Sequence, residues 1–195
     1  VDLESYTLID AELSRFSPVR YTTPFWNIFG IKGYDMTTCN TCGQTVTSHW
    51  YRSELQVEIP PGRQSSLDAC IKNYCKSGPL NDSNDKCADR CRRRMCRCKQ
   101  AYVTSWPEIL TVQLKRWIPV GGTGAYIKEK RPVTLPNVLN DLPGDPTVKY
   151  TLRAAVVHLG EAGGGHYVNL TKNRDSDSWI LSSDTSVTRI AASMP

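Results

Sequence analysis

The sequence has no long apolar run and nothing that marks it for export. A membrane-spanning helix needs about 18 or more consecutive apolar residues, and no such run occurs in the 195 residues. Residues 1–4 (VDLE) lack the basic and apolar regions of a secretory signal peptide. These absences predict an intracellular protein, cytoplasmic or nuclear, with reduced thiols and no membrane contact. The first residue is valine rather than methionine, which we interpret as the mark of a fragment.

Aromatic residues are also few, and internal repeats are absent. Aromatics make up 9% of the chain and hydrophobic residues 39%. At this length, that content is enough to bury a core without disulfides. We therefore expect a single domain over residues 1–195.

Positive charge is concentrated in one segment, although the formal net charge is only +5. The segment carries Lys86, Arg90, Arg92, Arg93, Arg94, Arg97 and Lys99. It lacks the interleaved aromatics that binding of single-stranded nucleic acid favours. A solvated, arginine-rich tip is one interpretation, and a contact for phosphate or an acidic partner is the other. Nucleic-acid binding is the weaker hypothesis.

Two groups of cysteines have the spacing of metal ligands. Cys39 and Cys42 form a CxxC followed by Gly43, and glycine there allows the tight turn that aims amides at the sulfurs. The second half of the site would come from Cys87 and Cys91, or from Cys96 and Cys98. Disulfides are the alternative, but a reducing compartment favours tetrahedral zinc.

Cys70 and Cys75 follow a different pattern. One helical face would carry apolar residues at i, i+3, i+4, i+7 and i+8, with Ser65 or Ser66 as N-cap. These positions are Leu67, Cys70, Ile71, Tyr74 and Cys75. We expect both cysteines to be core thiols, because nothing nearby would lower their pKa.

The remaining pattern is rich in strands. Residues 54–59 alternate polar and apolar before Pro60, which predicts a half-exposed strand in a two-sided finger. Residues 109–117 and 150–159 are also predicted strands, and the latter is the longest apolar one. Residues 160–165 (GEAGGG) follow, and their glycines would permit close approach of another backbone.

A histidine strand and a tryptophan strand close the chain. The first is GGHYV, which contains His166, and the second is WILSSD, which runs from Trp179 to Asp184. A cysteine nucleophile needs a base and a group that orients the base. His166 and the polar pair Ser183 and Asp184 are candidates for these roles, which is half of a thiol protease.

The order of these segments resembles the fingers and palm of the ubiquitin-specific protease family of deubiquitinases. The motifs are CxxC, SLDACIKNY, a second cysteine group, WPEILTVQLKRW, RPVTLPNVL, YTLRAAVVHLGEAGGGHYVNL and WILSSDTSV. The resemblance implies an α+β fold with an antiparallel-sheet palm at about residues 107–195. A zinc-binding fingers subdomain would be inserted at about residues 34–106. The whole would be a partial papain-like cysteine protease fold that lacks most of the thumb.

Carried over residue by residue, the resemblance makes His166 the general base and His158 a structural histidine. Ser183 occupies the third triad position, where most members have Asp or Asn and some have Ser. Asp184 matches the adjacent family acid. The alternative is that Ser183 and Asp184 only cap the turn that follows them.

The resemblance also implies a substrate channel and a set of zinc ligands. The channel for a ubiquitin C-terminal Gly-Gly would lie between the glycine loops, including residues 121–124. Its residues would be Trp117, where the family usually has Phe, and Gly163, Gly164, Gly165 and Tyr167. The structural zinc would be bound by Cys39, Cys42, Cys87 and Cys91, with Cys96 or Cys98 as the fallback ligand.

The family's nucleophile lies in a Gly-Asn-x-Cys motif upstream of the fingers, and residues 1–38 contain no cysteine. The chain could be the C-terminal part of a cleaved or two-chain enzyme, a piece trimmed at a boundary, or a pseudoprotease. Alone, it should hydrolyse nothing. Its expected partner is ubiquitin or a ubiquitin-like protein. Its role is then to supply the base to a separate cysteine-bearing segment, or to be an inactive ubiquitin-binding scaffold in a larger assembly. A zinc-finger nucleic-acid module is a third, weaker hypothesis.

Overall fold

The computed structural model describes residues 23–80, 87, 97–161, 163–173, 176 and 178–190. Within these residues the chain forms two helices and sixteen strands, and all but two of the strand pairings between them are antiparallel. The helices are α2 (Pro24–Phe29) and α3 (Leu67–Tyr74). The first strands are β1 (Ile31–Cys39), β2 (Thr45–Arg52), β3 (Leu55–Val57), β4 (Ser65–Ser66), β5 (Gly78–Pro79), β6 (Arg97–Ser105) and β7 (Val112–Leu114). The others are β8 (Trp117–Pro119), β9 (Tyr126–Lys128), β10 (Val133–Thr134), β11 (Val138–Leu139), β12 (Tyr150–Thr151), β13 (Ala154–Glu161), β14 (Gly164–Lys172), β15 (Trp179–Ser183) and β16 (Ser186–Ile190).

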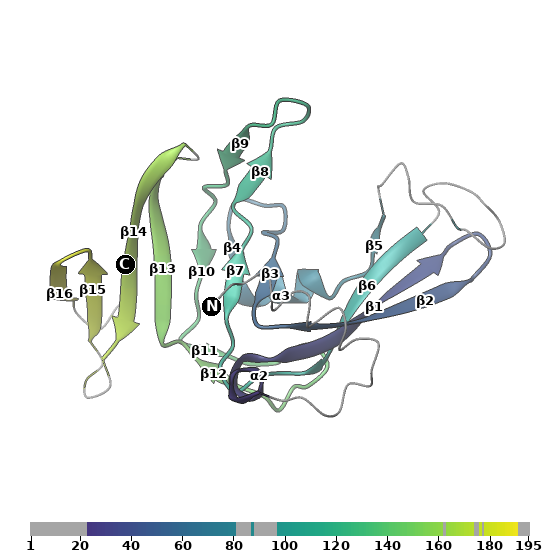
Figure 1. Cartoon of the computed structure of the whole chain (residues 1–195), viewed down its shortest axis with the longest axis horizontal. Helices are drawn as coiled ribbons and strands as arrows, with labels where there is room; N and C mark the ends of the chain where they lie inside the picture. Colours follow the sequence, from purple (N-terminus) through teal and green to yellow (C-terminus); the bar gives the residue numbers. More distant parts are fainter. Residues whose placement is uncertain are drawn as a thin grey trace.

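Two four-stranded sheets lie at opposite ends of the molecule, with α3 and the short strand pairs between them (Figure 1). The first has the order β2-β1-β6-β5, and its β1–β2 hairpin runs in register from Ile31 opposite Arg52 to Thr38 opposite Thr45. The second has the order β13-β14-β15-β16, so each strand pairs with its neighbour in sequence. Hairpin connections of this kind are local and place the His166 and Trp179 strands side by side.

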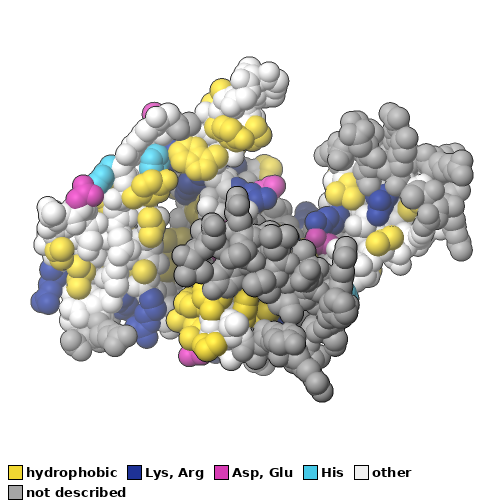
Figure 2. All heavy atoms as spheres, viewed as in Figure 1, with side chains coloured by type: hydrophobic (Ala, Val, Ile, Leu, Met, Phe, Trp, Pro, Cys, Tyr) yellow, Lys and Arg dark blue, Asp and Glu magenta, His cyan; other side chains and the backbone are white. Residues whose placement is uncertain are grey.

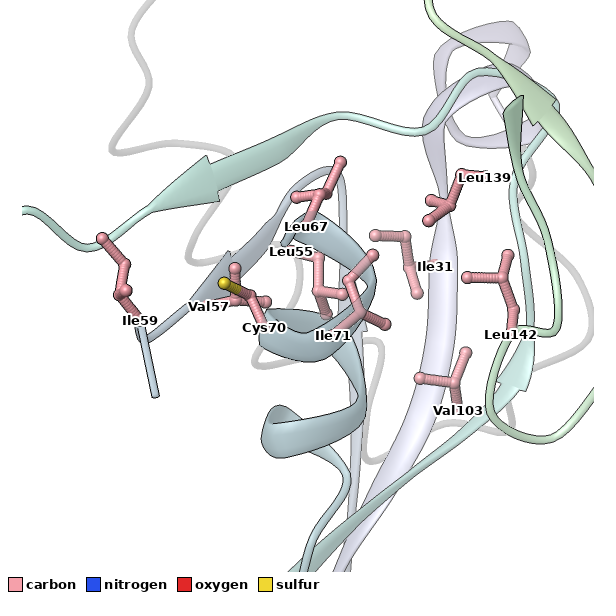
Figure 3. Close-up of a cluster of buried hydrophobic side chains, with 10 residues drawn as sticks. All are labelled: Ile31, Leu55, Val57, Ile59, Leu67, Cys70, Ile71, Val103, Leu139 and Leu142. Carbon is pink, nitrogen blue, oxygen red and sulfur yellow. The ribbon is translucent and has the colours of Figure 1, made fainter. Parts of the chain in front are cut away.

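The core lies around α3, whose sequence specifies both its start and its buried face. Ser66 is the N-cap, and its hydroxyl accepts a hydrogen bond from the Ala69 N–H at 3.2 Å. Cys70 and Ile71 are fully buried. Figure 3 shows the surrounding cluster of Ile31, Leu55, Val57, Ile59, Leu67, Val103, Leu139 and Leu142. One helix therefore joins residues that are far apart in the sequence.

The strand predictions hold in part. The strand expected at residues 54–59 is shorter, and it pairs in parallel with β7, outside the β2-β1-β6-β5 sheet. Leu55 and Val57 are buried in the core around α3, whereas Gln56 between them is exposed, which confirms the half-exposed strand. The strand expected at 150–159 is broken between β12 and β13, where the Leu152 N–H donates to the Asn137 carbonyl at 2.9 Å.

Within the described ranges, no helix has the length and apolar character needed to cross a membrane. Most of the basic segment, including Arg90 and Arg92, lies outside those ranges. Lys99 is described, and its Nζ lies 2.6 Å from Asp35 in the neighbouring strand β1. Part of the positive charge is therefore already paired.

Candidate active site and metal centre

The structure brings His166, Ser183 and Asp184 together at one end of the β13–β16 sheet. His166 lies near the start of β14, and Ser183 ends β15 just before the turn to β16. The imidazole Nε2 lies 2.7 Å from the Ser183 hydroxyl, and Nδ1 lies 3.9 Å from an Asp184 carboxylate oxygen. The His166 side chain is 43% exposed. These contacts leave the ring open to solvent on one side.

The two neighbours of His166 differ in what they do chemically. The Ser183 hydroxyl is within normal hydrogen-bond distance of Nε2, so it orients the ring. Asp184 is too far from Nδ1 for a hydrogen bond, and its carboxylate is 83% exposed, so solvent screens its charge. When Nε2 carries the proton and donates it to Ser183, Nδ1 presents its lone pair as a base.

An aromatic row includes Tyr167, the residue that follows His166 in β14. The His158 ring lies between Trp117 and Tyr167, at centroid distances of 5.3 and 4.7 Å. Trp117 is 41% and Tyr167 60% exposed. Figure 2 shows hydrophobic side chains beside histidines over the upper ends of β13 and β14 and over β8 and β9. We call Trp117, His158 and Tyr167 the aromatic row.

Close backbone approach, expected at three consecutive glycines, occurs at one of them. A β-carbon on Gly165 would collide with the Leu159 carbonyl and the His158 ring. Gly163 and Gly164 have open space around the same position. Gly160 has a φ of +116°, a conformation that favours glycine. The turn before His166 therefore depends on Gly160 and Gly165.

Three cysteines come together at the turn between β1 and β2. The sulfurs of Cys39, Cys42 and Cys87 all lie within 4.8 Å of one another, and those of Cys42 and Cys87 are 3.5 Å apart. Four thiolates around zinc, each about 2.3 Å from the ion, would be about 3.8 Å apart. The donor set therefore fits a zinc ion. Cys91 lies outside the described residues, and the Cys98 sulfur instead accepts a hydrogen bond from the Asn40 amide at 3.0 Å.

The local backbone explains why the knuckle forms. The Gly43 N–H donates to the Cys39 carbonyl and the Cys39 N–H to the Gln44 carbonyl, both at 2.9 Å. Gly43 has a φ of +71°. A backbone hydrogen bond at Gln44 lowers the pKa of Cys42, whereas burial and the thiols of Cys39 and Cys87 raise it more, to about 11. A bound divalent cation would replace these protons, because thiolate is the ligand form.

Of the two expected core thiols, Cys70 is fully buried in the core, and Cys75 is partly buried against it. Burial raises the pKa of Cys70 and, more strongly, that of Cys75, to about 11. All six described cysteines are thiols rather than half-cystines. Cys70 and Cys75 are therefore poor nucleophiles at neutral pH.

Sequence reasoning missed one residue of this region. The Lys128 ammonium donates to the carbonyls of His158 at 2.7 Å and Gly160 at 2.8 Å. A lysine at the end of a short strand carries no pattern that predicts such a contact, because its acceptors are backbone groups that every residue has.

Comparison with known proteins identifies the family. The family model described as ubiquitin carboxyl-terminal hydrolase matches residues 9–195. Ubiquitin carboxyl-terminal hydrolase 4 of Arabidopsis thaliana is 31% identical over 157 residues, which are 77% of this chain and 41% of that protein. Ubiquitin carboxyl-terminal hydrolase Usp2 of Drosophila melanogaster is 29% identical over 149 residues, which are 72% of this chain and 15% of that protein.

Solved structures share the fold. A chain of the yeast SAGA DUBm superimposes with a TM-score of 0.76 at 24% identity, over 96% of this chain and 43% of that one. A chain of the SAGA DUB module of Ubp8, Sgf11, Sus1 and Sgf73 bound to monoubiquitin gives a TM-score of 0.72 at 22% identity, over 95% of this chain and 42% of that one. The chain thus spans less than half the length of these relatives. Because the family match extends over nearly all its residues, the chain belongs to the ubiquitin carboxyl-terminal hydrolase family of ubiquitin-specific proteases.

Proposed function

We propose that this chain is the base-bearing part of a cysteine deubiquitinase, which binds ubiquitin or a ubiquitin-like protein. Its nucleophile would lie on a separate or preceding segment. The observation that carries the proposal is the contact of 2.7 Å between His166 Nε2 and the Ser183 hydroxyl. The exposed Tyr167 of the aromatic row follows His166 in β14. The family assignment supplies the reaction class.

In this mechanism His166 accepts a proton and then donates it, once in each of two half-reactions. Nδ1 takes the proton of the cysteine thiol, and the thiolate attacks the carbonyl carbon of the isopeptide bond. The C–N bond breaks, and the imidazolium gives the proton to the departing lysine amine. His166 then takes a proton from water, the resulting hydroxide attacks the thioester carbonyl carbon, the C–S bond breaks, and the imidazolium returns the proton to the cysteine thiolate. Ser183 orients the ring throughout, and Asp184 adds a screened charge.

The substrate channel would lie along the glycine turn and the aromatic row. The C-terminal Gly-Gly of the modifier would be flanked by Trp117, Tyr167, Gly163, Gly164 and Gly165. A tail without side chains can be contacted only through its backbone, so the residues that line the channel must lie close to it. Two observations support this placement. Gly163 and Gly164 are open to solvent, and one solved relative is a module bound to monoubiquitin.

The metal would be structural zinc in a fingers subdomain. Cys39, Cys42 and Cys87 would supply three thiolates and Cys91 the fourth, and the ion would fix the end of the β1–β2 hairpin. We propose that residues of about 34–106 are these fingers and that about 107–195 are the palm of a papain-like fold without most of its thumb. Reduced thiols at this site agree with an intracellular setting, cytoplasmic or nuclear.

A catalytically inactive, ubiquitin-binding scaffold is the second candidate. The observation that favours it is the neutral Ser183 on Nε2, with the acid at 3.9 Å and exposed, because an imidazolium gains little charge stabilisation there. Solved relatives belong to a module of several proteins, Ubp8, Sgf11, Sus1 and Sgf73. A larger assembly is therefore a reasonable setting for this chain too.

Titration of the ¹⁵N-labelled chain with ubiquitin tests what both candidates share. Amides of Trp117 and residues 163–167 should shift, with a dissociation constant of roughly micromolar or weaker for part of a standard interface. The arginine-rich segment should respond little. Absence of shifts at several hundred micromolar ubiquitin (about the limit for that affinity) would contradict binding. Salt-dependent shifts of that segment with an RNA oligonucleotide would favour nucleic acid instead.

Activity separates the two candidates. When the chain is joined to a segment that carries the Gly-Asn-x-Cys motif, an enzyme should release a fluorophore from the ubiquitin C terminus. A scaffold should bind the same substrate without turnover.

A further inference from the structure

Among the described residues, strand β13 is at the edge of its sheet, and Lys128 donates hydrogen bonds to the side that faces away from β14. An edge strand turns alternate carbonyls away from its partner, and these need other donors or water. In β13 two such carbonyls, of His158 and Gly160, both accept from Lys128 Nζ, at 2.7 and 2.8 Å. Hydrogen bonds from an ammonium are stronger than those between neutral groups.

Lys128 reaches this edge from the β8–β9 hairpin. Within the hairpin it is paired with Trp117, so the ammonium and the indole lie side by side on one face. Trp117 meets the His158 ring while Lys128 binds the His158 carbonyl. The hairpin therefore contacts His158 of β13 through both the side chain and the backbone of that residue.

The segment of β13 that Lys128 binds pairs with the part of β14 that carries His166. His158 pairs with Tyr167, Leu159 with His166, and Gly160 with Gly165. Gly160 has a positive φ, and Gly165 packs directly on the Leu159 carbonyl. The register of β13 with β14 is continuous through this segment, and Lys128 binds β13 from the side opposite β14.

We propose that Lys128 is a positioning residue. It holds the β8–β9 hairpin against the β13–β14 turn and so keeps the aromatic row in the conformation that binds the modifier's tail. This inference rests on the proposed ubiquitin-binding function. A second link between the same segments, the Lys130–Glu161 ion pair, is about two-thirds exposed on both sides and contributes little by comparison.

The test compares Lys128→Met with Lys130→Met in the full chain. Lys128→Met keeps the apolar stem and removes both hydrogen bonds. Amide hydrogen exchange of residues 158–167 should become about tenfold faster, and ubiquitin affinity should fall about tenfold, in line with the loss of one or two charge-assisted bonds. Lys130→Met should leave both quantities within about twofold. Lys128→Arg, which can still donate to two carbonyls, should restore affinity to within about threefold of wild type.

A measurement on the wild-type chain does not depend on how the variants fold. The ¹⁵Nζ ammonium protons of Lys128 should exchange with water more slowly than those of Lys130, because two carbonyls hold them. Equal rates would overturn the inference. Normal ubiquitin binding by Lys128→Met would overturn it alone, whereas failure of the wild-type chain to bind ubiquitin would overturn the proposed function and the inference with it.

Discussion

The imidazole of His166 is held by a neutral hydroxyl. Ser183 orients Nε2 at 2.7 Å but adds no compensating charge. Asp184 lies near Nδ1 only at 3.9 Å and is largely solvated. Orientation is therefore expected to matter more than charge at this site.

The first residue-scale prediction concerns these roles in a protein that carries the nucleophile. His166→Ala should lower kcat/KM by about 10⁴-fold or more, because the proton acceptor is lost. Ser183→Ala should cost about fivefold, the equivalent of one hydrogen bond of about 1 kcal/mol. Ser182, its neighbour on the opposite face of β15, offers the matched control Ser182→Ala, which should be near wild type. Equal losses in the two serine variants would remove Ser183 from the site.

The second concerns Cys75, whose pKa burial raises from 9.0 to about 11. The folded state favours the protonated thiol, so this group's contribution to stability is complete below pH 9 and is lost as the pH rises toward 11. The free energy of unfolding of the wild-type chain should therefore fall relative to that of Cys75→Ala across this range. Urea denaturation at several pH values measures the difference, and a constant difference would show that Cys75 is not buried as described.

At the scale of elements, the turn between β1 and β2 should depend on zinc. One zinc per chain is expected by elemental analysis, and Cys39→Ser should release it and loosen the hairpin, because structural zinc contributes folding free energy directly. Cys98→Ser is the control, since its sulfur bonds to Asn40 instead, and it should retain the metal. A metal-free but fully folded preparation, or a Cys39–Cys42 disulfide, would contradict the zinc site.

The turn between β13 and β14 offers a steric test. Gly165→Ala should destabilise the chain by about 1–3 kcal/mol, because the new methyl group meets the Leu159 carbonyl and the His158 ring. Gly164→Ala has open space and should change stability by less than about 0.5 kcal/mol. Thermal unfolding of both variants gives the comparison. If the two are equally stable, the close approach at Gly165 does not exist in solution.

At the scale of the whole molecule, most of the buried side chains among the described residues cluster around α3, and the β13–β16 sheet adds only Leu170 and Trp179. Ile71 is fully buried among Ile31, Val103 and Leu139, whereas Val156 of β13 is 71% exposed. Ile71→Ala should cost about 2–5 kcal/mol, and amides of β1, β6 and β11 should lose protection together. Val156→Ala should cost less than about 0.5 kcal/mol. Separate loss of protection in β1 and β11 would show that the cluster is not one cooperative unit.

Much of the local structure follows from residues close together in the sequence. Ser66 caps α3, and Leu67, Cys70 and Ile71 form its buried face, because both features depend on helical spacing alone. The CxxC followed by Gly43 predicts the turn between β1 and β2, because the turn needs a residue with a positive φ and glycine adopts one without strain. The family motifs likewise identify the histidine strand before any coordinates are known.

The tertiary structure decided which segments far apart in the sequence contact each other. The hydroxyl of Ser183 meets a histidine 17 residues away, the sulfurs of Cys42 and Cys87 meet across 45 residues, and Lys128 meets a carbonyl 30 residues on. The parallel pairing of β3 with β7 belongs to the same class. Such contacts depend on how the strands pack around α3, and the same side chains could find other partners in another packing. The sequence by itself therefore determined the candidate base, the knuckle and the helix, and the fold determined what each of them touches.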